Sequence, residues 1–386
     1  MASSRRTQIP HDARSGNLAI IVSFLLIISL PLASNIIGID GADPQSENRG
    51  LATMPRLDGT FASIADYGNN FGRWFEDHFA FRATLVRWYG ETRYFWLGVS
   101  PSPTVIKGRD GWLFYADDGS LEDCVNETLL SASELEAWRE TLTRTHSWLR
   151  ARGVAYVFTI PPDKHAIYPE KLPSSLRCMN TTSRTDQVEA MLADRTSVPV
   201  VDVRPALLSA KARDRVYFQT DTHWNDRGAL VAYQRIIEAV RRQVPSVPPA
   251  WTRGDFEPTE RVIEGLDLAR MIGLTRILHE TDYGLRPGRP HQARVIEPAG
   301  GAWNAEVGRF VTEIPGSGLP RALIFRDSFT SRLAPLLSEH FSRAVYLWQN
   351  DFDADAVGQE RPDVVIQEIA GRHLYVFTPS PELIPQ

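Results

Sequence analysis

Two short stretches of the sequence carry residues whose types and spacing suit acyl-transfer chemistry. One stretch places Asp221 and His223 two residues apart, after an apolar run and before a helical pattern. If Asp221 accepts a hydrogen bond from one ring nitrogen of His223, the other nitrogen is free to act as a base. In the other stretch an apolar run leads directly into Ser328, and a helical pattern follows. The two stretches together predict a catalytic triad with Ser328 as the nucleophile.

Each stretch alone also fits a simpler explanation. An Asp-x-His pair is common as a surface hydrogen bond or as two metal ligands, and an Asp-Ser pair before a helix is often only its N-cap. Both stretches, however, lie where an apparent strand gives way to a helix, which is where α/β proteins keep functional groups. This shared position favours the catalytic interpretation, and we expect neither a metal nor a cofactor.

Further candidates lie close to these stretches. Lys164 and His165 follow a buried strand predicted over residues 154–160, in a loop that could face a substrate or simply be solvated. Trp224, Asn225 and Asn350 are weaker candidates for contacts with the substrate or its oxyanion. The backbone N–H of Ser328, at the start of a helix, is the expected oxyanion donor.

The elements that must position these residues follow from the pattern of apolar runs. Helices are expected within residues 61–96, with their aromatic side chains in the core, and a hairpin over residues 105–115 turns at Asp110-Gly111. Ser131 and Glu134 form the capping box of a helix that ends near Gly153. Strands are predicted at residues 154–160, 198–203, 216–218, 322–325, 344–348 and 363–367. Strands that alternate with helices indicate a three-layer α/β fold with a mainly parallel sheet.

The segment from residue 244 to 320 has weak periodicity and frequent Pro and Gly. We expect it to be an insertion near the active site, with a helix over residues 266–277.

The N-terminus carries a targeting signal. Residues 1–17 contain arginines and precede an apolar run over residues 18–39. A helix of that length is about 33 Å long, close to the thickness of a bilayer's hydrocarbon core. We therefore expect residues 18–39 to be an uncleaved signal anchor, with a cytoplasmic N-terminus and an exported remainder. A cleaved signal peptide is the alternative.

Composition limits the kinds of partner that the chain of 386 residues can have. Its formal net charge of −5 argues against a nucleic-acid partner. Residues 40–56 are rich in Gly, Asp, Pro, Ser and Asn and are interpreted as a linker, and residues 57–386 as one catalytic domain. The two cysteines, Cys124 and Cys178, are predicted to form a disulfide in an exported chain, although two separate thiols also fit.

Several motifs in order resemble the alginate O-acetyltransferase family, the AlgJ/AlgX group of SGNH-hydrolase-like proteins. The matching stretches are residues 108–115, 161–165, 168–169, 220–225, 327–329 and 362–366, with Glu368 and Arg372. Asp221 and His223 fall on the family's Asp-x-His pair and Ser328 on its nucleophile. Arg326 departs from the wider serine motif, where glycine is usual. No carbohydrate-binding module follows the catalytic domain, so the plan is more similar to AlgJ than to AlgX.

The resemblance implies the transfer of acetyl groups onto an exopolysaccharide in the periplasm, by an enzyme held in the bacterial inner membrane. It also implies a membrane-bound O-acyltransferase partner that delivers the acetyl group. Two other functions fit the same residues: a polysaccharide O-acetyl esterase with the same triad, and a non-catalytic carbohydrate-binding subunit of a secretion complex.

Overall fold

The structure is a computed structural model that describes residues 17–18, 20–27, 29–30, 34, 52–57, 59–79, 81–125, 129–176, 182–298, 308–377 and 379–384. The chain divides into two compact units, Met1–Pro101 and Ser102–Gln386. The unit that contains the sheet thus begins at Ser102, whereas the sequence was interpreted as one domain from residue 57.

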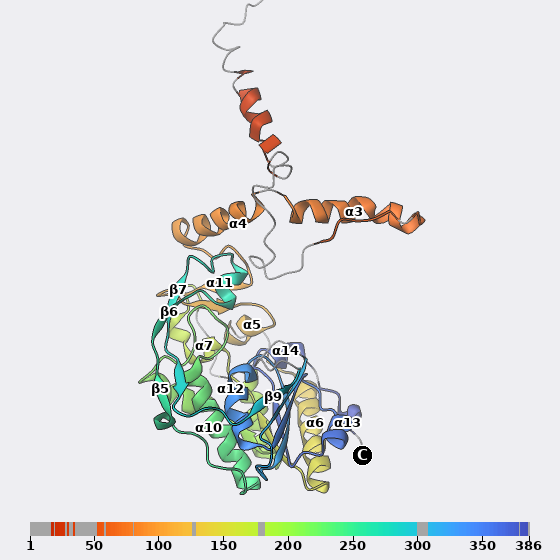
Figure 1. Cartoon of the computed structure of the whole chain (residues 1–386), viewed down its shortest axis with the longest axis vertical. Coiled ribbons are helices and arrows are strands. Elements are labelled where there is room, and N and C mark those ends of the chain that lie inside the picture. The colour runs from red at the N-terminus through yellow and green to blue at the C-terminus, as the bar shows by residue number, and fades with distance from the viewer. Residues whose placement is uncertain are drawn as a thin grey trace, which may run out of the picture. The chain divides into compact units, whose positions relative to one another are not determined.

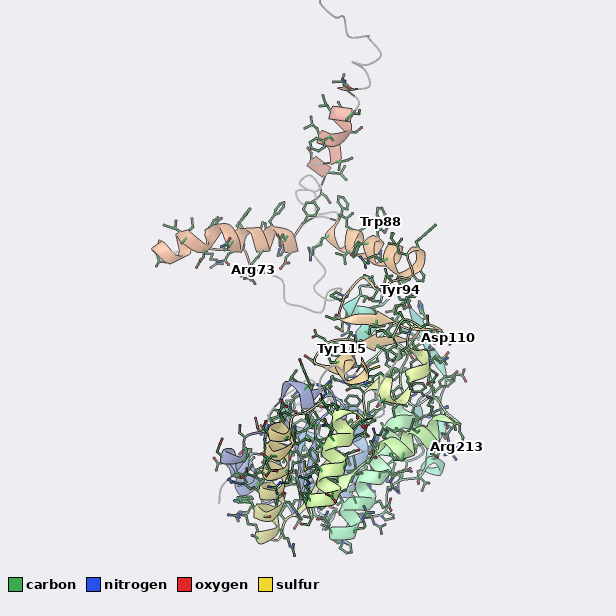
Figure 2. All side chains as sticks on the ribbon, turned by 180° about the vertical axis from the view of Figure 1, so that it is seen from behind. Arg73, Trp88, Tyr94, Asp110, Tyr115 and Arg213 are labelled. Atoms are coloured by element: carbon green, nitrogen blue, oxygen red, sulfur yellow. The ribbon has the colours of Figure 1, made fainter. Side chains whose placement is uncertain are left out.

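The first unit contains helices α3 (Phe61–Asp77) and α4 (Arg82–Glu91), followed by the π-helical turn η1 (Thr92–Trp96). The helices agree with those expected from the sequence. Of the aromatic residues expected to form core, Tyr94 in η1 is buried, whereas several on the two helices are exposed. Trp88 on α4 is 60% exposed and Phe75 on α3 is 42% exposed, because nothing in the unit covers these faces among the residues described. Figure 2 labels Trp88 on α4.

Only part of the expected anchor, residues 18–39, is among the described residues: 18, 20–27, 29–30 and 34. Across the described part of the chain, no helix has the length and apolar character needed to cross a membrane.

The second unit is built on a seven-stranded sheet with the strand order β4-β3-β13-β11-β12-β10-β9. The first five strands are parallel, and β10 and β9 are added antiparallel at one edge. The mainly parallel sheet predicted from the sequence is therefore confirmed. The strands are β3 (Ala155–Thr159), β4 (Val200–Val201), β9 (Arg294–Glu297), β10 (Arg309–Glu313), β11 (Arg321–Arg326), β12 (Arg343–Trp348) and β13 (Val364–Glu368).

Helices cover both faces of this sheet. On one side lie α10 (Asp226–Gln243) and α12 (Thr330–Leu337), and on the other α6 (Ala132–Ala151) and α13 (Ala354–Glu360), as Figure 1 shows. Strand β11 contributes side chains to the packing on both faces of the sheet. Ile324 packs into the cluster under α10 and α12, whereas Leu323 and Phe325 pack into the cluster that includes α6, α8 (Arg184–Arg195) and α13. Burial on both faces explains the unbroken apolar runs of these strands.

The shorter elements of this unit lie mainly at the edges of the layers. They are α5 (Ser120–Val125), α7 (Lys164–Ile167), η2 (Pro169–Lys171), α9 (Arg204–Lys211), η3 (Arg253–Asp255), η4 (Ser338–His340), α14 (His373–Val376) and η5 (Pro381–Leu383).

Local sequence signals set two of the expected elements. Strands β1 (Val105–Lys107) and β2 (Leu113–Tyr115) pair antiparallel, and both Asp110 (φ 54°) and Gly111 (φ 80°) take the left-handed conformation that tight hairpin turns require. Helix α6 begins with the predicted capping box, in which the Ser131 hydroxyl accepts the N–H of Glu134 and the Glu134 carboxylate accepts the N–H of Ser131.

The weakly periodic segment at residues 244–320 forms two small sheets and a short helix, and its last two strands, β9 and β10, join the edge of the main sheet. Strand β5 (Phe256–Pro258) pairs with β8 (Leu285–Pro287), and β6 (Arg261–Glu264) pairs with β7 (His279–Asp282). The helix expected over residues 266–277 is only α11 (Asp267–Met271). It stops early because Gly273 adopts a left-handed conformation (φ 71°) just beyond its end.

Cys124 is buried at the edge of the core and is disulfide-bonded. The other cysteine of the chain, Cys178, lies outside the described residues.

Candidate active site

The loop that carries Asp221 and His223 closes on itself. The N–H of Asn225 donates to the carbonyl of Val216 (3.0 Å), and the N–H of Phe218 donates to the carbonyl of His223 (3.2 Å). The strand predicted at residues 216–218 is therefore wrong. Its backbone forms a single bridge within the loop, Tyr217 to Trp224, and bonds otherwise to the side chains of Tyr168 and Lys164, so it does not join the sheet.

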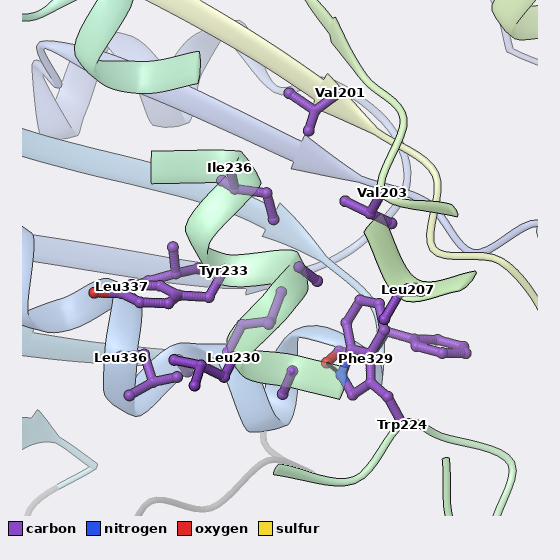
Figure 3. Packing of buried hydrophobic residues seen from close by; sticks show 14 of the residues in the cluster. Val201, Val203, Leu207, Trp224, Leu230, Tyr233, Ile236, Phe329, Leu336 and Leu337 are labelled. Carbon is purple, nitrogen blue, oxygen red and sulfur yellow. Dashed lines mark hydrogen bonds between the residues drawn. The ribbon is translucent and has the colours of Figure 1, made fainter. Parts of the chain in front are cut away.

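Trp224 and Asn225, which were expected to contact the substrate, hold this loop in place instead. Both side chains are fully buried. The indole N–H of Trp224 donates to the carbonyl of Phe329 (3.1 Å), which ties the loop to the residue after Ser328. Figure 3 shows Trp224 and Phe329 together within the core cluster. Asn225 is the N-cap of α10, where its side-chain oxygen accepts two backbone N–H groups.

The structure brings Asp221, His223 and Ser328 into one hydrogen-bonded chain. Nδ1 of His223 lies 2.7 Å from Oδ1 of Asp221, and Nε2 of His223 lies 2.7 Å from Oγ of Ser328. Burial alone would raise the pKa of Asp221, but the charge and hydrogen bonds of His223 lower it to about 2. Asp221 is therefore ionised at neutral pH and fixes the ring so that Nε2 faces the serine hydroxyl.

Asp221 and His223 are also the residues that would bind a metal ion in the alternative interpretation of the Asp-x-His pair. Ligand atoms of Asp221, His223 and Asp267 lie within 4.8 Å of one another. Both ring nitrogens of His223, however, already have partners in Asp221 and Ser328. A metal ion on either nitrogen would have to replace one of these hydrogen bonds, so the geometry favours proton transfer over metal binding.

The nucleophile lies in a sharp turn between β11 and α12 that Asp327 holds. One carboxylate oxygen of Asp327 accepts the N–H of Phe329 (2.9 Å), and the other accepts the N–H of Ala370 (2.7 Å) beyond the neighbouring strand β13. The N–H of Ser328 donates to no other residue in the described part of the chain. It is thus available as the expected oxyanion donor.

A second buried carboxyl group supports the same turn. Oε2 of Glu368 accepts the N–H of Asp327 (3.0 Å) and the hydroxyl of Thr330 (2.7 Å). Burial and the adjacent charge of Asp327 raise the pKa of Glu368 well above its ordinary value. The pKa of Asp327 is lowered in spite of its own burial, chiefly by His373, whose Nδ1 lies 3.1 Å from Oδ2 of Asp327. The two pKa values are therefore shifted in opposite directions, and Glu368 keeps its proton to a higher pH than Asp327 does.

Arg326, the departure from the wider serine motif, has its side chain inside the fold. The side chain is fully buried, and its guanidinium lies 4.2 Å from the ring centre of Trp348 and 5.4 Å from that of Phe310. These contacts accommodate the larger residue against strands β12 and β10, and Nη1 of Arg326 also donates to the carbonyl of Asp327 in the turn (3.4 Å).

Lys164 and His165, which could have faced a substrate or been solvated, are both buried. The ammonium group of Lys164 donates to the carbonyls of Phe218 and Gln219, each at 3.0 Å, and so anchors the start of the Asp-His loop. Burial lowers the pKa of Lys164 to about 8, even though nearby carboxylates act in the opposite direction. His165 lines a cavity of about 10 Å³ with Lys164 and Thr222, which is room for about one water molecule.

Asn350 is placed away from the triad. It lines a small cavity with Trp138 and Gln367 on the α6 side of the sheet, whereas the turn at Ser328 leads into α12 on the opposite side. It is therefore not positioned to bind an oxyanion at Ser328.

Two carboxylates of the insertion, Asp267 and Glu280, were missed in the sequence. Glu280 accepts the N–H groups of Gln219 and Thr220, both at 2.9 Å, and Asp267 accepts the N–H of Thr222 at 2.9 Å. Neither lies in a motif or a periodic segment, and only the tertiary contact reveals them.

Comparison with known proteins agrees with this architecture. Residues 105–299, about half of the chain, match the family described as the SGNH hydrolase-like domain of the acetyltransferase AlgX. This range includes Asp221 and His223 and ends before Ser328. The SGNH-like α/β fold expected from the sequence is thus confirmed.

Among related sequences, a probable alginate O-acetylase AlgJ of Pseudomonas putida is 33% identical over 145 residues, and one of Pseudomonas aeruginosa is 28% identical over 139 residues. Each match covers 36% of this chain, and it covers 35% and 34% of the respective relative. The chain therefore matches about a third of the length of these relatives.

Among solved structures, Bacillus cereus PatB1 with a sulfonyl adduct has a TM-score of 0.53 at 17% identity, over 70% of this chain and 94% of PatB1. A DHHW family protein from Eubacterium siraeum has a TM-score of 0.51 at 16% identity, over 71% of this chain and 95% of its own. At these identities the likeness concerns the fold.

Proposed function

Because the chain belongs to the family of the SGNH hydrolase-like domain of the acetyltransferase AlgX, we propose that it is an O-acetyltransferase that acts on an exopolysaccharide. The observation that carries this proposal is the hydrogen-bonded chain from Asp221 through His223 to Ser328. The related AlgJ proteins are described as probable alginate O-acetylases, so alginate or a similar polymer is the acceptor that we propose.

In the first step, Oγ of Ser328 attacks the carbonyl carbon of an acetyl donor while Nε2 of His223 takes the hydroxyl proton. Ionised Asp221 stabilises the imidazolium that forms, and the N–H of Ser328 stabilises the oxyanion. When the tetrahedral intermediate collapses, His223 returns the proton to the leaving group. The acetyl group then remains on Ser328 as an ester.

In the second step, a hydroxyl group of the sugar acceptor enters the site from which the donor's leaving group has departed. His223 removes its proton as the oxygen attacks the acetyl-serine, and the proton returns to Oγ of Ser328 when the ester breaks. The acetyl group leaves on the polysaccharide. If water attacked instead, the same residues would release acetate, so the acceptor decides between transferase and esterase.

We expect acetyl transfer to exceed hydrolysis. The purified protein is incubated with an activated acetyl ester and alginate oligosaccharides, and acetylated sugar and free acetate are quantified in the same sample by mass spectrometry and an acetate assay. Transfer should exceed hydrolysis, with the Ser328→Ala protein giving the background for both products. Release of acetate alone would identify an esterase, and the absence of both products would point to a binding subunit.

We further propose that residues 18–39 anchor the protein in the bacterial inner membrane and that the catalytic unit works in the periplasm. A membrane-bound O-acyltransferase partner would then supply the acetyl group. The positive charge of residues 1–17, followed by the apolar run, supports this orientation.

A reporter fused after Gln386 tests this topology. We expect alkaline phosphatase, which is active only outside the cytoplasm, to be active in the fusion, and the protein to sediment with membranes. A matched fusion that lacks residues 1–39 should lose both properties. An active cytoplasmic reporter, such as green fluorescent protein in the same position, would contradict the proposed orientation.

A further inference from the structure

We propose that Asp267 is a positioning residue for the triad: a second carboxylate that, together with Asp221, holds His223 and strengthens it as a base. This inference rests on the proposed function, because it assigns a role in the activation of Ser328. Asp267 begins helix α11 in the insertion, outside the sheet that carries the nucleophile.

Contacts with Thr222 bring the carboxylate of Asp267 to the histidine. One oxygen of Asp267 accepts the N–H of Thr222 (2.9 Å), and the other accepts the Thr222 hydroxyl (2.7 Å). The Thr222 oxygen lies 3.0 Å from Nδ1 of His223. The same oxygen lies 3.5 Å from Nε2, so Thr222 holds the face of the ring while the Nδ1–H points to Asp221.

The charge of Asp267 also acts on the ring directly. Its Oδ2 lies 3.9 Å from Nδ1 of His223, on the nitrogen that Asp221 holds at 2.7 Å. Two carboxylates therefore flank the nitrogen that becomes part of the imidazolium when His223 takes the serine proton. A second negative charge at this distance favours the protonated ring and so favours removal of the proton from Ser328.

The surroundings of Asp267 make this support depend on pH. Burial and the charge of Asp221 raise its pKa to about 6, whereas His223 and Lys164 oppose that shift. Beyond these groups lie Glu280, paired with Arg215 at 3.1 Å, and Arg332, which faces Asp221. Asp267 is ionised above this pH and neutral below it, so its contribution should be present at pH 8 and absent at pH 5.

The test measures the reactivity of Ser328 without a sugar acceptor. In a fluorophosphonate probe, Oγ of Ser328 attacks phosphorus and displaces fluoride while the hydroxyl proton goes to His223. The rate of labelling is measured from pH 5 to pH 8. We expect Asp267→Asn to label about tenfold more slowly than wild type at pH 8, and at about the same rate at pH 5, where the wild-type carboxyl group is itself neutral.

Glu264→Gln is the matched control, because it removes an exposed carboxylate three residues away on β6. It should label like wild type at every pH. Thermal unfolding of Asp267→Asn at pH 8 separates function from folding. The neutral amide replaces a carboxylate that burial disfavours, so the variant should unfold at or above the wild-type temperature.

Two outcomes would overturn the inference: a ratio of rates that is the same at all pH values, or an Asp267→Asn protein that fails to fold. Either result would make Asp267 a residue kept for structure. Failure of the proposed function would look different, because labelling would then be absent in the wild type or would persist in Ser328→Ala.

Discussion

Ser328→Ala is expected to reduce acetyl transfer by about 10³- to 10⁶-fold while the protein stays folded. The substitution removes the oxygen that lies 2.7 Å from Nε2 of His223 and leaves the turn intact, since Asp327 holds that turn through backbone N–H groups. His223→Ala should reduce the rate about as much, and Asp221→Asn somewhat less, because it misorients the base without removing it.

The double variant Ser328→Ala/His223→Ala should be little slower than either single variant, because the two residues act as one unit. Ser342→Ala serves as the control. Ser342 precedes β12 at the opposite, amino-terminal end of the parallel strands, where its hydroxyl donates to the carbonyl of Pro320. Transfer and hydrolysis are measured with the activated ester. Near-wild-type rates in folded Ser328→Ala would rule out the triad and leave Asp221 and His223 as metal ligands or structural residues.

The second large effect concerns the buried ion pair beside the nucleophile. Nη1 of Arg372 donates to Oδ1 of Asp163 at 2.9 Å, and both side chains are only 7% exposed. The guanidinium also lies 5.2 Å from the ring centre of Phe329, the residue after Ser328. Arg372→Met should lower the free energy of unfolding by about 3–5 kcal/mol, because it leaves the charge of Asp163 buried without its partner.

Urea unfolding at constant pH measures this loss against a matched exposed pair. Arg235→Met breaks the pair with Glu238, whose side chains are 49% and 53% exposed, and should change the free energy by no more than about 1 kcal/mol. Adding Asp163→Asn to Arg372→Met should restore part of the stability, since the stranded charge is removed. Equal losses of unfolding free energy in Arg372→Met and Arg235→Met would show that the buried pair stabilises the fold no more than the exposed pair does.

The sequence predicted those parts of the molecule that local patterns determine. Buried parallel strands need apolar residues on both faces, so β3, β11, β12 and β13 are visible as short apolar runs. The hairpin at Asp110-Gly111 and the capping box at Ser131 follow from the conformations and hydrogen bonds of single residues. The triad was predicted because its members occupy recognisable stretches at the edges of such elements.

The parts that were not predicted depend on contacts between distant segments. The run at residues 216–218 is as apolar as a strand, yet its backbone groups bond to the Asp-His loop and to distant side chains, not to the sheet. Lys164 looks like an exposed loop residue, but it finds two carbonyl acceptors in the interior. Asp267 lies in a segment of weak periodicity, and its carboxylate comes within 3.9 Å of Nδ1 of His223 only when the insertion folds against the loop.

The support of the Asp-His loop by the insertion has a consequence for local stability. The amide protons of Gln219, Thr220 and Thr222 are all bound by carboxylates of the insertion. In native-state hydrogen exchange, these amides should therefore become exposed together with those of the insertion, as one cooperative unit. The free energy of opening this unit should be lower than the free energy of unfolding the sheet. Mild denaturant would then inactivate the enzyme before the sheet unfolds.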